Sequence, residues 1–116
     1  MGYERRLYVI EKSDIWKDEN GKCWSEVIAT FNLCRVNIDF RKYPATESYF
    51  YTNNEKVVED CYGESLKELT IKQAISEIEE AMERDGEYRR WNPILGMLKG
   101  FKEREWKDLR VLHYGY

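Results

Sequence analysis

The spacing of apolar residues changes once along this chain, close to Gly63, and that change limits what the chain can fold into. Before Gly63, apolar side chains recur at every second residue, as in WSEVIATFNLCRV, which spans residues 24–36. After it they recur at every third or fourth residue, as in Ile71, Ile75 and Ile78. The first spacing is that of a half-buried β-strand and the second that of an amphipathic helix. The sequence therefore predicts an α+β fold with the sheet first and the helices after it.

A turn sequence predicts that the first two strands form a hairpin. Asn20-Gly21 lies between a strand expected over residues 5–11 and another expected over residues 24–36. An Asn-Gly pair between alternating apolar segments is the strongest short-range sign of a β-hairpin. In the second strand, strict alternation would place four apolar side chains together on one face: Val27, Ala29, Phe31 and Leu33.

A second hairpin is expected around Asn53 and Asn54, which separate the segments SYFYT and KVVEDCY. Asparagine tolerates the left-handed backbone conformation that a tight turn requires. Four strands joined by short turns predict an antiparallel N-terminal sheet. The tail, residues 110–116, can either add an edge strand or dock on the helices.

Capping residues predict the first helix. Thr70 and Gln73 form a capping box, and Gly86 can end the helix that follows. The length of the chain suits a single hydrophobic core. We therefore expect one domain, residues 1–116, in which two to three helices pack on one face of the four-stranded sheet.

A further helix is expected from Pro93 to about Leu109. Asn92 is a good N-cap, and proline suits the first position of a helix because its φ is already set and its missing N–H would have no helical partner there. This boundary would leave Tyr88 and Trp91 in a short turn before the helix. Within the helix, two glycines one turn apart, Gly96 and Gly100, indicate either close packing on the rest of the fold or a contact between subunits of a homodimer.

The sequence favours a protein that is not an enzyme and that carries no metal or cofactor. The cysteines Cys23, Cys34 and Cys61 lack the C-x-x-C spacing of zinc sites, and the chain has one histidine, His113. The G-x-S-x-G, P-loop and G-x-G-x-x-G motifs are missing. A Cys–His catalytic pair would require His113, and a lone histidine near the C-terminus is more often a packing or surface residue.

The chain is expected to stay in a cytoplasm. It contains no run of 18 apolar residues, and its start, MGYERRLYVI, lacks the long apolar segment of a signal peptide. An odd number of cysteines without a pairing pattern fits reduced thiols. We therefore expect neither a membrane span nor secretion.

The predicted acidic helix is one candidate surface for binding a partner. Residues 55–87 hold eleven acidic and four basic side chains, whereas residues 88–116 hold seven basic and three acidic ones. The two segments can compensate each other by packing together, or the acidic face can occupy a nucleic-acid site on another protein. In the second case the contact residues are expected to be Glu77, Glu80, Glu83 and Asp85.

Aromatic residues of the predicted sheet are a second candidate surface. Tyr49 and Tyr51 are separated by Phe50, so one face of that strand presents aromatic rings unless something covers it. Together with Tyr8 and Trp24 they can form an exposed patch, since Tyr and Trp are enriched at interfaces. Burial of these rings under the helices is the alternative.

A third candidate, for a small molecule or a nucleotide, lies just before the predicted helix and consists of Tyr88, Arg89, Arg90 and Trp91. The basic C-terminal segment that follows also interleaves cations with aromatic rings, a pattern that can bind nucleic acid. However, Lys99 and Glu103 alternate in sign at i, i+4, which is typical of a solvated helix. The net charge of −3 also gives no overall basic footprint, so direct nucleic-acid binding is the weaker hypothesis.

The segments RRLYVIEKS, WSEVIATFNLC, VVEDCYGESLKE and GMLKGF resemble short accessory proteins of phages and prophages in low-GC Gram-positive bacteria. The resemblance implies a small soluble protein made in the cytoplasm of a bacterial host. Such proteins often bind and block a host component, as anti-CRISPR and other anti-defence inhibitors do. The resemblance supplies no site residues.

The leading hypothesis from the sequence is a non-enzymatic inhibitor that blocks a host protein or nucleoprotein through the acidic helix, with Tyr49 and Tyr51 as anchors. Two alternatives stay open. One is a small-molecule or nucleotide-sequestering protein that uses Arg89, Arg90 and Trp91. The other is a nucleic-acid-binding accessory protein that uses the basic C-terminal segment.

Overall fold

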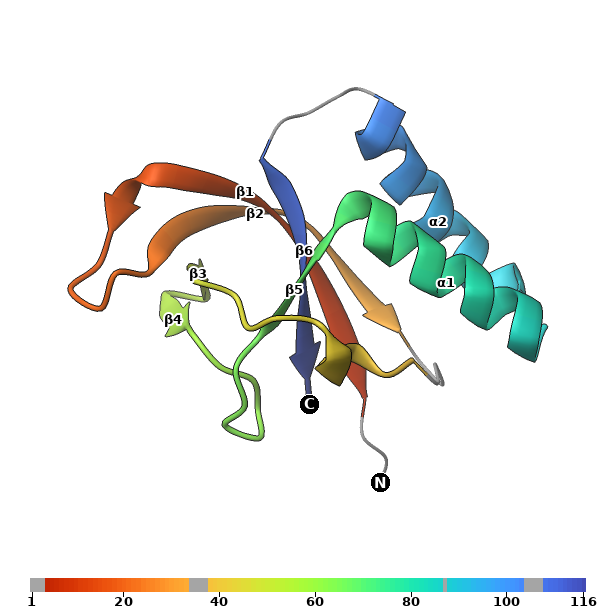
Figure 1. The fold of residues 1–116 in the computed structure, drawn as a ribbon, viewed down its shortest axis with the longest axis horizontal. Coiled ribbons are helices and arrows are strands. Elements are labelled where there is room, and N and C mark those ends of the chain that lie inside the picture. The colour runs from red at the N-terminus through yellow and green to blue at the C-terminus, as the bar shows by residue number, and fades with distance from the viewer. Residues whose placement is uncertain (1–3, 34–37, 87, 104–107) are drawn as a thin grey trace.

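A six-stranded sheet with two helices on one face forms the protein (Figure 1). The computed structural model describes residues 4–33, 38–86, 88–103 and 108–116. The strands are β1 (Arg5–Lys17), β2 (Cys23–Leu33), β3 (Ser48–Thr52), β4 (Glu55–Val57), β5 (Lys67–Thr70) and β6 (Leu109–Gly115), in the spatial order β4-β3-β2-β1-β6-β5. The helices are α1 (Ile71–Asp85) and α2 (Tyr88–Glu103), which pack against each other, and a short 3-10 helix, η1, spans Phe40–Lys42.

The α+β class and both hairpins are confirmed. β1 and β2 pair in antiparallel fashion, and β3 and β4 do the same. The turn between β3 and β4 places Asn53 at a φ of 51° and Asn54 at 67°, the left-handed conformation for which asparagine is suited.

The prediction of a purely N-terminal, antiparallel four-stranded sheet is wrong in two respects. The first is that β5 and β6 extend the sheet, and β6, the C-terminal tail, lies between β1 and β5 rather than at an edge. Val111 and Leu112 point to opposite faces of the sheet and are both fully buried, which favours an inner position. The second is that β3 runs parallel to β2, with which it pairs at Cys23 and Trp24.

A β-bulge corrects the predicted face of β2. Val9 pairs with Ala29 but Ile10 pairs with Val27, so Ile28 is an extra residue opposite the β1 backbone. An extra residue reverses the alternation of side chains beyond it. Val27 therefore packs on the face opposite the helices, whereas Ala29, Phe31 and Leu33 pack towards the helices. The four side chains predicted to share one face are thus divided between two.

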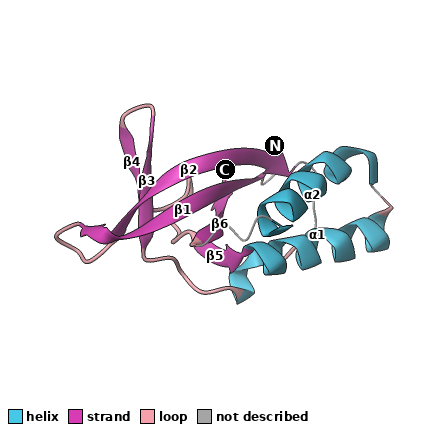
Figure 2. Cartoon of the chain, turned by 90° about the horizontal axis from the view of Figure 1, so that it is seen from above, coloured by secondary structure: helices cyan, strands magenta, loops and turns pink. Residues whose placement is uncertain are grey.

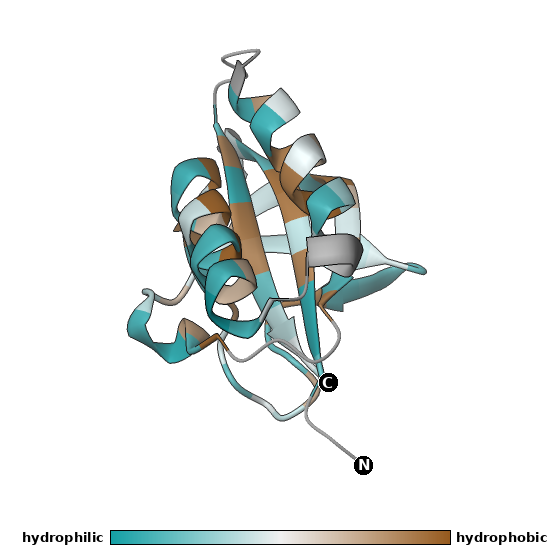
Figure 3. Cartoon of the chain, turned by 90° about the vertical axis from the view of Figure 1, so that its right-hand side faces the viewer, coloured by the Kyte–Doolittle hydropathy of each residue, from teal (hydrophilic) through white to brown (hydrophobic). Residues whose placement is uncertain are grey.

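The first helix begins and ends as predicted. Thr70 is the N-cap, its hydroxyl accepts from the backbone N–H of Gln73 at 3.1 Å, and the Gln73 side chain accepts from the N–H of Thr70 at 2.9 Å. Gly86 ends the helix in the left-handed conformation with φ 71°. The apolar stripe of α1 faces the sheet and its polar side faces solvent, as the colours of Figure 3 show.

The second helix begins earlier than predicted. α2 starts at Tyr88, so Pro93 lies inside the helix and Asn92 is not its N-cap. A proline there removes one backbone hydrogen bond, and burial of the large Trp91 side chain, 2% exposed, compensates for that loss. Leu109, expected at the end of this helix, instead begins β6. Residues 104–107 and the end of the second predicted strand, residues 34–36, lie outside the described residues.

Both faces of the sheet are covered, but by different elements. On one face, Leu7, Val9 and Val111 contact the apolar sides of α1 and α2. On the other face, Tyr8 packs against Phe50 of β3 with 4.5 Å between ring centroids. In Figure 2 the β3–β4 hairpin projects at the end of the sheet away from the helices. No helix of the described residues is long and apolar enough to cross a membrane.

The prediction that Gly96 and Gly100 allow close packing is wrong. A Cβ atom built on either glycine would meet no heavy atom of the other described residues within 4 Å, apart from its chain neighbours and the backbone of its own helix. Neither position has a positive φ, so the backbone does not require glycine there. A subunit contact at these glycines stays a prediction.

Replacing Gly96 with alanine is expected to raise the free energy of unfolding by about 1 kcal/mol, because glycine in a helix interior costs about that much relative to alanine. Urea denaturation followed by circular dichroism measures the change. Gly86→Ala is the matched control and is expected to lower the stability, since its φ is 71°. A Gly96→Ala protein less stable than the wild type would contradict the open surroundings of Gly96.

Candidate functional site

A pocket of about 470 Å³ lies at the end of the sheet where β1 and β5 begin and β6 ends. Near the N and C labels of Figure 1, the helices do not extend over this end of the sheet. Its wall is formed by three strand residues, by the segment around η1, and by the loop of residues 60–65. This volume suits a small organic ligand.

Strand register brings the three strand residues of the pocket together. His113 on β6 pairs with Leu7 on β1 and with Lys67 on β5. Directly opposed residues of antiparallel strands point to the same face, so Leu7, Lys67 and His113 share one face of the sheet. Arg5 lies two residues before Leu7 on the same strand and therefore points to that face as well. Arg5, Lys67 and His113 therefore continue the face that is apolar under the helices, at the end where the pocket replaces them.

His113 is the buried base of the pocket. Its ring stacks on Phe40 with 4.4 Å between centroids and an interplanar angle of 15°. Burial and, to a smaller extent, the positive charges of Arg5 and Lys67 together lower the pKa of His113 from its ordinary value of 6.5 to about 4, against the opposing effect of Asp60. The imidazole is therefore neutral at pH 7.

The two cations of the strands, Arg5 and Lys67, lie in the pocket wall with the neutral imidazole of His113. The guanidinium carbon of Arg5 is 5.6 Å from the centroid of the Phe40 ring, an arrangement in which the ring face attracts the charge. Lys67 forms no ion pair with any residue that the structure describes. Both charges act on His113.

Two of the carboxylates of the pocket hold backbone in place. Asp60, 8% exposed, accepts hydrogen bonds at Oδ1 from the backbone N–H of Tyr62 at 2.8 Å and of Glu64 at 3.0 Å, which shapes the loop. Asp39 caps η1 by accepting from the backbone N–H of Arg41 at 3.0 Å, and it also accepts from Nε of that residue at 3.1 Å. The hydrogen bonds from Arg41 lower the pKa of Asp39.

The predicted acidic contact residues have different environments. Glu77 lies mostly buried, where it accepts from Lys42 Nζ at 2.6 Å and from the Tyr43 hydroxyl at 2.7 Å. It therefore joins the C-terminal end of η1 to α1. Asp85 forms an ion pair with the adjacent Arg84 at 3.3 Å. Glu80 and Glu83 are exposed.

Of the four rings in the predicted aromatic patch, Tyr8 and Tyr49 are buried, though not by the helices, and Trp24 is half-buried. Tyr49 is 9% exposed, with Lys56 Nζ 4.3 Å from the centroid of its ring, and Tyr8 is 5% exposed beneath β3. Tyr51 alone of the two predicted anchors is exposed, at 51%. Its strand and α1 lie at opposite ends of the molecule in both Figure 1 and Figure 2, so the acidic helix and Tyr51 do not form one surface.

In the third predicted site, the ring of Trp91 is not accessible to a ligand. Trp91 belongs to the core between the helices and the sheet and is 2% exposed, so its ring cannot stack on a ligand. The side chains of Tyr88, Arg89 and Arg90 lie outside the described part of the structure.

The sequence favoured a packing or surface role for His113 over a catalytic one, and it did not indicate Arg5, Phe40 or Lys67 as site residues. One pattern could have identified the two cations. Arg5 precedes Leu7 and Lys67 precedes Leu69 at alternate positions, so each cation occupies the apolar face of its strand. A charged residue on the inner face of a strand requires a partner, a ligand or access to solvent.

The sequence matches no protein-family model, and comparisons with curated proteins and with solved structures gave no significant match. Among the described residues, no group of three or more His, Cys, Asp or Glu side chains could hold a metal ion. The pocket therefore has to be interpreted from its own geometry.

NMR titration of the single histidine is expected to give a pKa of about 4 for His113. Because the folded pKa lies below the unfolded value of 6.5, the unfolded chain binds the proton more readily between these values. Stability is therefore expected to fall as the pH drops from 6.5 towards 4, and the contribution is fully present above 6.5. A His113→Phe protein should lose this part of the pH dependence, whereas a pKa of His113 near 6.5 would contradict the burial described above.

Proposed function

We propose that this chain is a non-enzymatic binding protein that holds a small anionic ligand, a carboxylate or a phosphate, in the pocket beside His113. The observation that carries the proposal is that the register of β1, β6 and β5 places Arg5 and Lys67 in the wall of one pocket, on either side of the buried His113. Both cations line the same partly desolvated pocket, where each would attract an anion. Hydrogen bonds between such cations and an anion are among the stronger polar contacts in proteins.

The aromatic ring of Phe40 and the loop of residues 60–65 would also contribute to binding of the proposed ligand. Phe40 is 3% exposed and stacks on His113, so it adds a small apolar area to the pocket wall beside the cations. The loop around Asp60 is fixed by its own hydrogen bonds, so little ordering is required when a ligand binds. A ligand with one anionic group and a small apolar part fits this combination.

The geometry favours binding over catalysis. A general base works best when its pKa lies near the working pH, whereas the pKa of His113 is about 4. Asp39 and Asp60 already accept backbone hydrogen bonds. The pocket residues are therefore better arranged to hold a ligand than to exchange protons with it.

The inhibitor hypothesis from the sequence has less support. Its surface would combine Glu77, Glu80, Glu83 and Asp85 with Tyr49 and Tyr51, and half of these six are engaged or buried. The exposed pair Glu80 and Glu83 remains available to a basic partner. A phage-encoded protein that sequesters a small ligand is equally compatible with the resemblance noted above.

Titration of ¹⁵N-labelled protein with sodium acetate, inorganic phosphate and adenosine monophosphate, each at constant ionic strength, is expected to shift the amide signals of residues 5, 67 and 113. Lys67→Gln should weaken the binding of the best anion by about tenfold or more, since a hydrogen bond to a charged group contributes about 1.5–3 kcal/mol. Lys72→Gln, at an exposed position of α1, is the matched control. The proposal fails if none of the three anions shifts these signals, or if the two variants lose affinity equally.

A further inference from the structure

One edge of β2 has no neighbouring strand over most of its length. β1 pairs with β2 from Leu33 to Cys23, whereas β3 pairs with it only at Cys23 and Trp24. The Ser25 hydroxyl still reaches the Tyr49 carbonyl at 2.7 Å. From Glu26 to Leu33, no other described segment lies hydrogen-bonded along the side of β2 away from β1.

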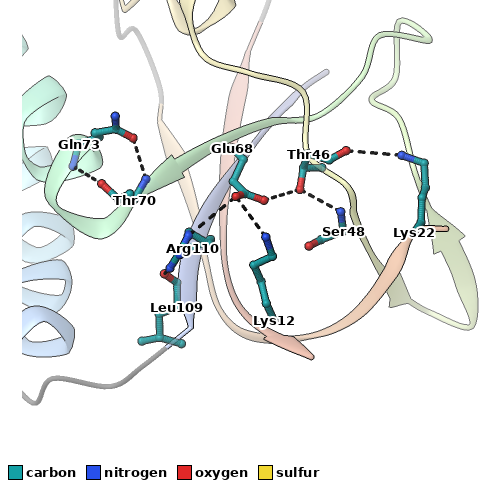
Figure 4. Close-up of polar contacts among 9 residues, drawn as sticks. All are labelled: Lys12, Lys22, Thr46, Ser48, Glu68, Thr70, Gln73, Leu109 and Arg110. Carbon is teal, nitrogen blue, oxygen red and sulfur yellow. Dashed lines mark hydrogen bonds and ion pairs between the residues drawn. The ribbon is translucent and has the colours of Figure 1, made fainter. Parts of the chain in front are cut away.

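The outer edge of β5 is covered. The N–H of Glu68 donates to the carbonyl of Pro44 at 2.9 Å, and the N–H of Thr46 donates to the carbonyl of Leu66 at 2.8 Å. Figure 4 shows that side chains reinforce this cover, because Glu68 accepts from the Thr46 hydroxyl at 2.7 Å and contacts Lys12 at 3.4 Å.

The outer edge of β4 is short and charged. This strand has three residues, and two of them are Glu55 and Lys56. Short edge strands and charged edge residues are devices that prevent the addition of a further strand. Of the strands that the structure describes, β2 is left with an edge that has neither kind of protection from Ala29 to Leu33, beyond the bulge at Ile28.

The free edge is uncharged and apolar in a way that favours strand addition. Residues 27–33, VIATFNL, contain no charge, no proline and no glycine. Segments of this length and composition readily pair with another strand. Ile28, Ala29 and Phe31 are only partly buried, so their remaining surface would be covered by a strand placed beside them.

Charge favours a second copy of the same chain in antiparallel orientation. Glu11 and Glu26 lie directly opposite each other at one end of the β1–β2 pair, an arrangement that is unfavourable on its own. Arg5 and Arg6 lie at the other end, opposite Leu33 and Asn32. Antiparallel pairing of two β2 strands brings the acidic end of each copy beside the basic end of the other.

We propose that two copies of this chain associate through β2, so that the two sheets become one continuous sheet across a two-fold axis near Thr30. In this register the Phe31 ring of each copy lies opposite Ala29 of the other, a large side chain beside a small one on the helix side. Isologous pairing of one surface with itself gives a closed dimer rather than a fibre. β2 contributes no residue to the anion pocket, so pairing along this edge leaves the pocket lining in place, although the charge of Arg5 bears on both.

Sedimentation equilibrium is expected to show a dimer of twice the 14.0 kDa of one chain as the concentration rises through the micromolar range. Thr30→Lys places two like charges against each other at the axis and should weaken dimerisation by about tenfold or more. Asn20→Lys, in the exposed turn between β1 and β2, adds the same charge away from the edge and should leave the dimer unchanged.

Hydrogen exchange at low and high protein concentration identifies the surface that pairs. Amides of residues 26–33 that do not bond to β1 are expected to exchange fast in the dilute monomer and to become protected at high concentration. A wild-type protein that stays monomeric at about 1 mM overturns the proposal. So does a dimer in which these amides gain no protection, or one that Thr30→Lys and Asn20→Lys weaken equally.

Discussion

The backbone hydrogen bonds of β6 join the two ends of the chain, because this C-terminal strand lies between β1 and β5. Arg5 pairs with Gly115, and His113 pairs with both Leu7 and Lys67. Without β6, β5 and the helix that follows it would have no strand to join them to the β1–β2 hairpin. The pocket beside His113 exists for the same reason, since its three strand residues come from three distant parts of the sequence.

Local features of the fold could be predicted from the sequence because they depend on neighbouring residues. The Asn-Gly and Asn-Asn turns and the Thr70–Gln73 capping box each satisfy backbone groups within a few positions. The position of β6 could not be predicted, since seven residues with mixed polarity do not indicate which strand they will join. The same limit applies to the bulge at Ile28, which divides an alternating pattern that looked continuous.

The candidate site was predicted less well, for a physical reason. Helical periodicity places Glu77 on the polar side of α1, but the end of η1 covers that position and binds the carboxylate through Lys42 and Tyr43. The sequence predicts that several aromatic residues lie at the surface, whereas Trp91 and Tyr8 are buried, at 2% and 5% exposure, as large aromatic side chains of a small core often are. Charges on inner strand faces, at Arg5 and Lys67, were the more informative pattern.

Binding of an anion at the proposed site is expected to change the pKa of His113. A bound anion adds negative charge beside the imidazole, which favours its protonated form, and linkage requires that protonation strengthen the binding of the anion in return. The most direct measurement is therefore the pKa of His113 by NMR with and without saturating inorganic phosphate. The pKa is expected to rise from about 4 when phosphate binds, whereas an unchanged pKa at saturation would contradict an anion site formed by Arg5, Lys67 and His113.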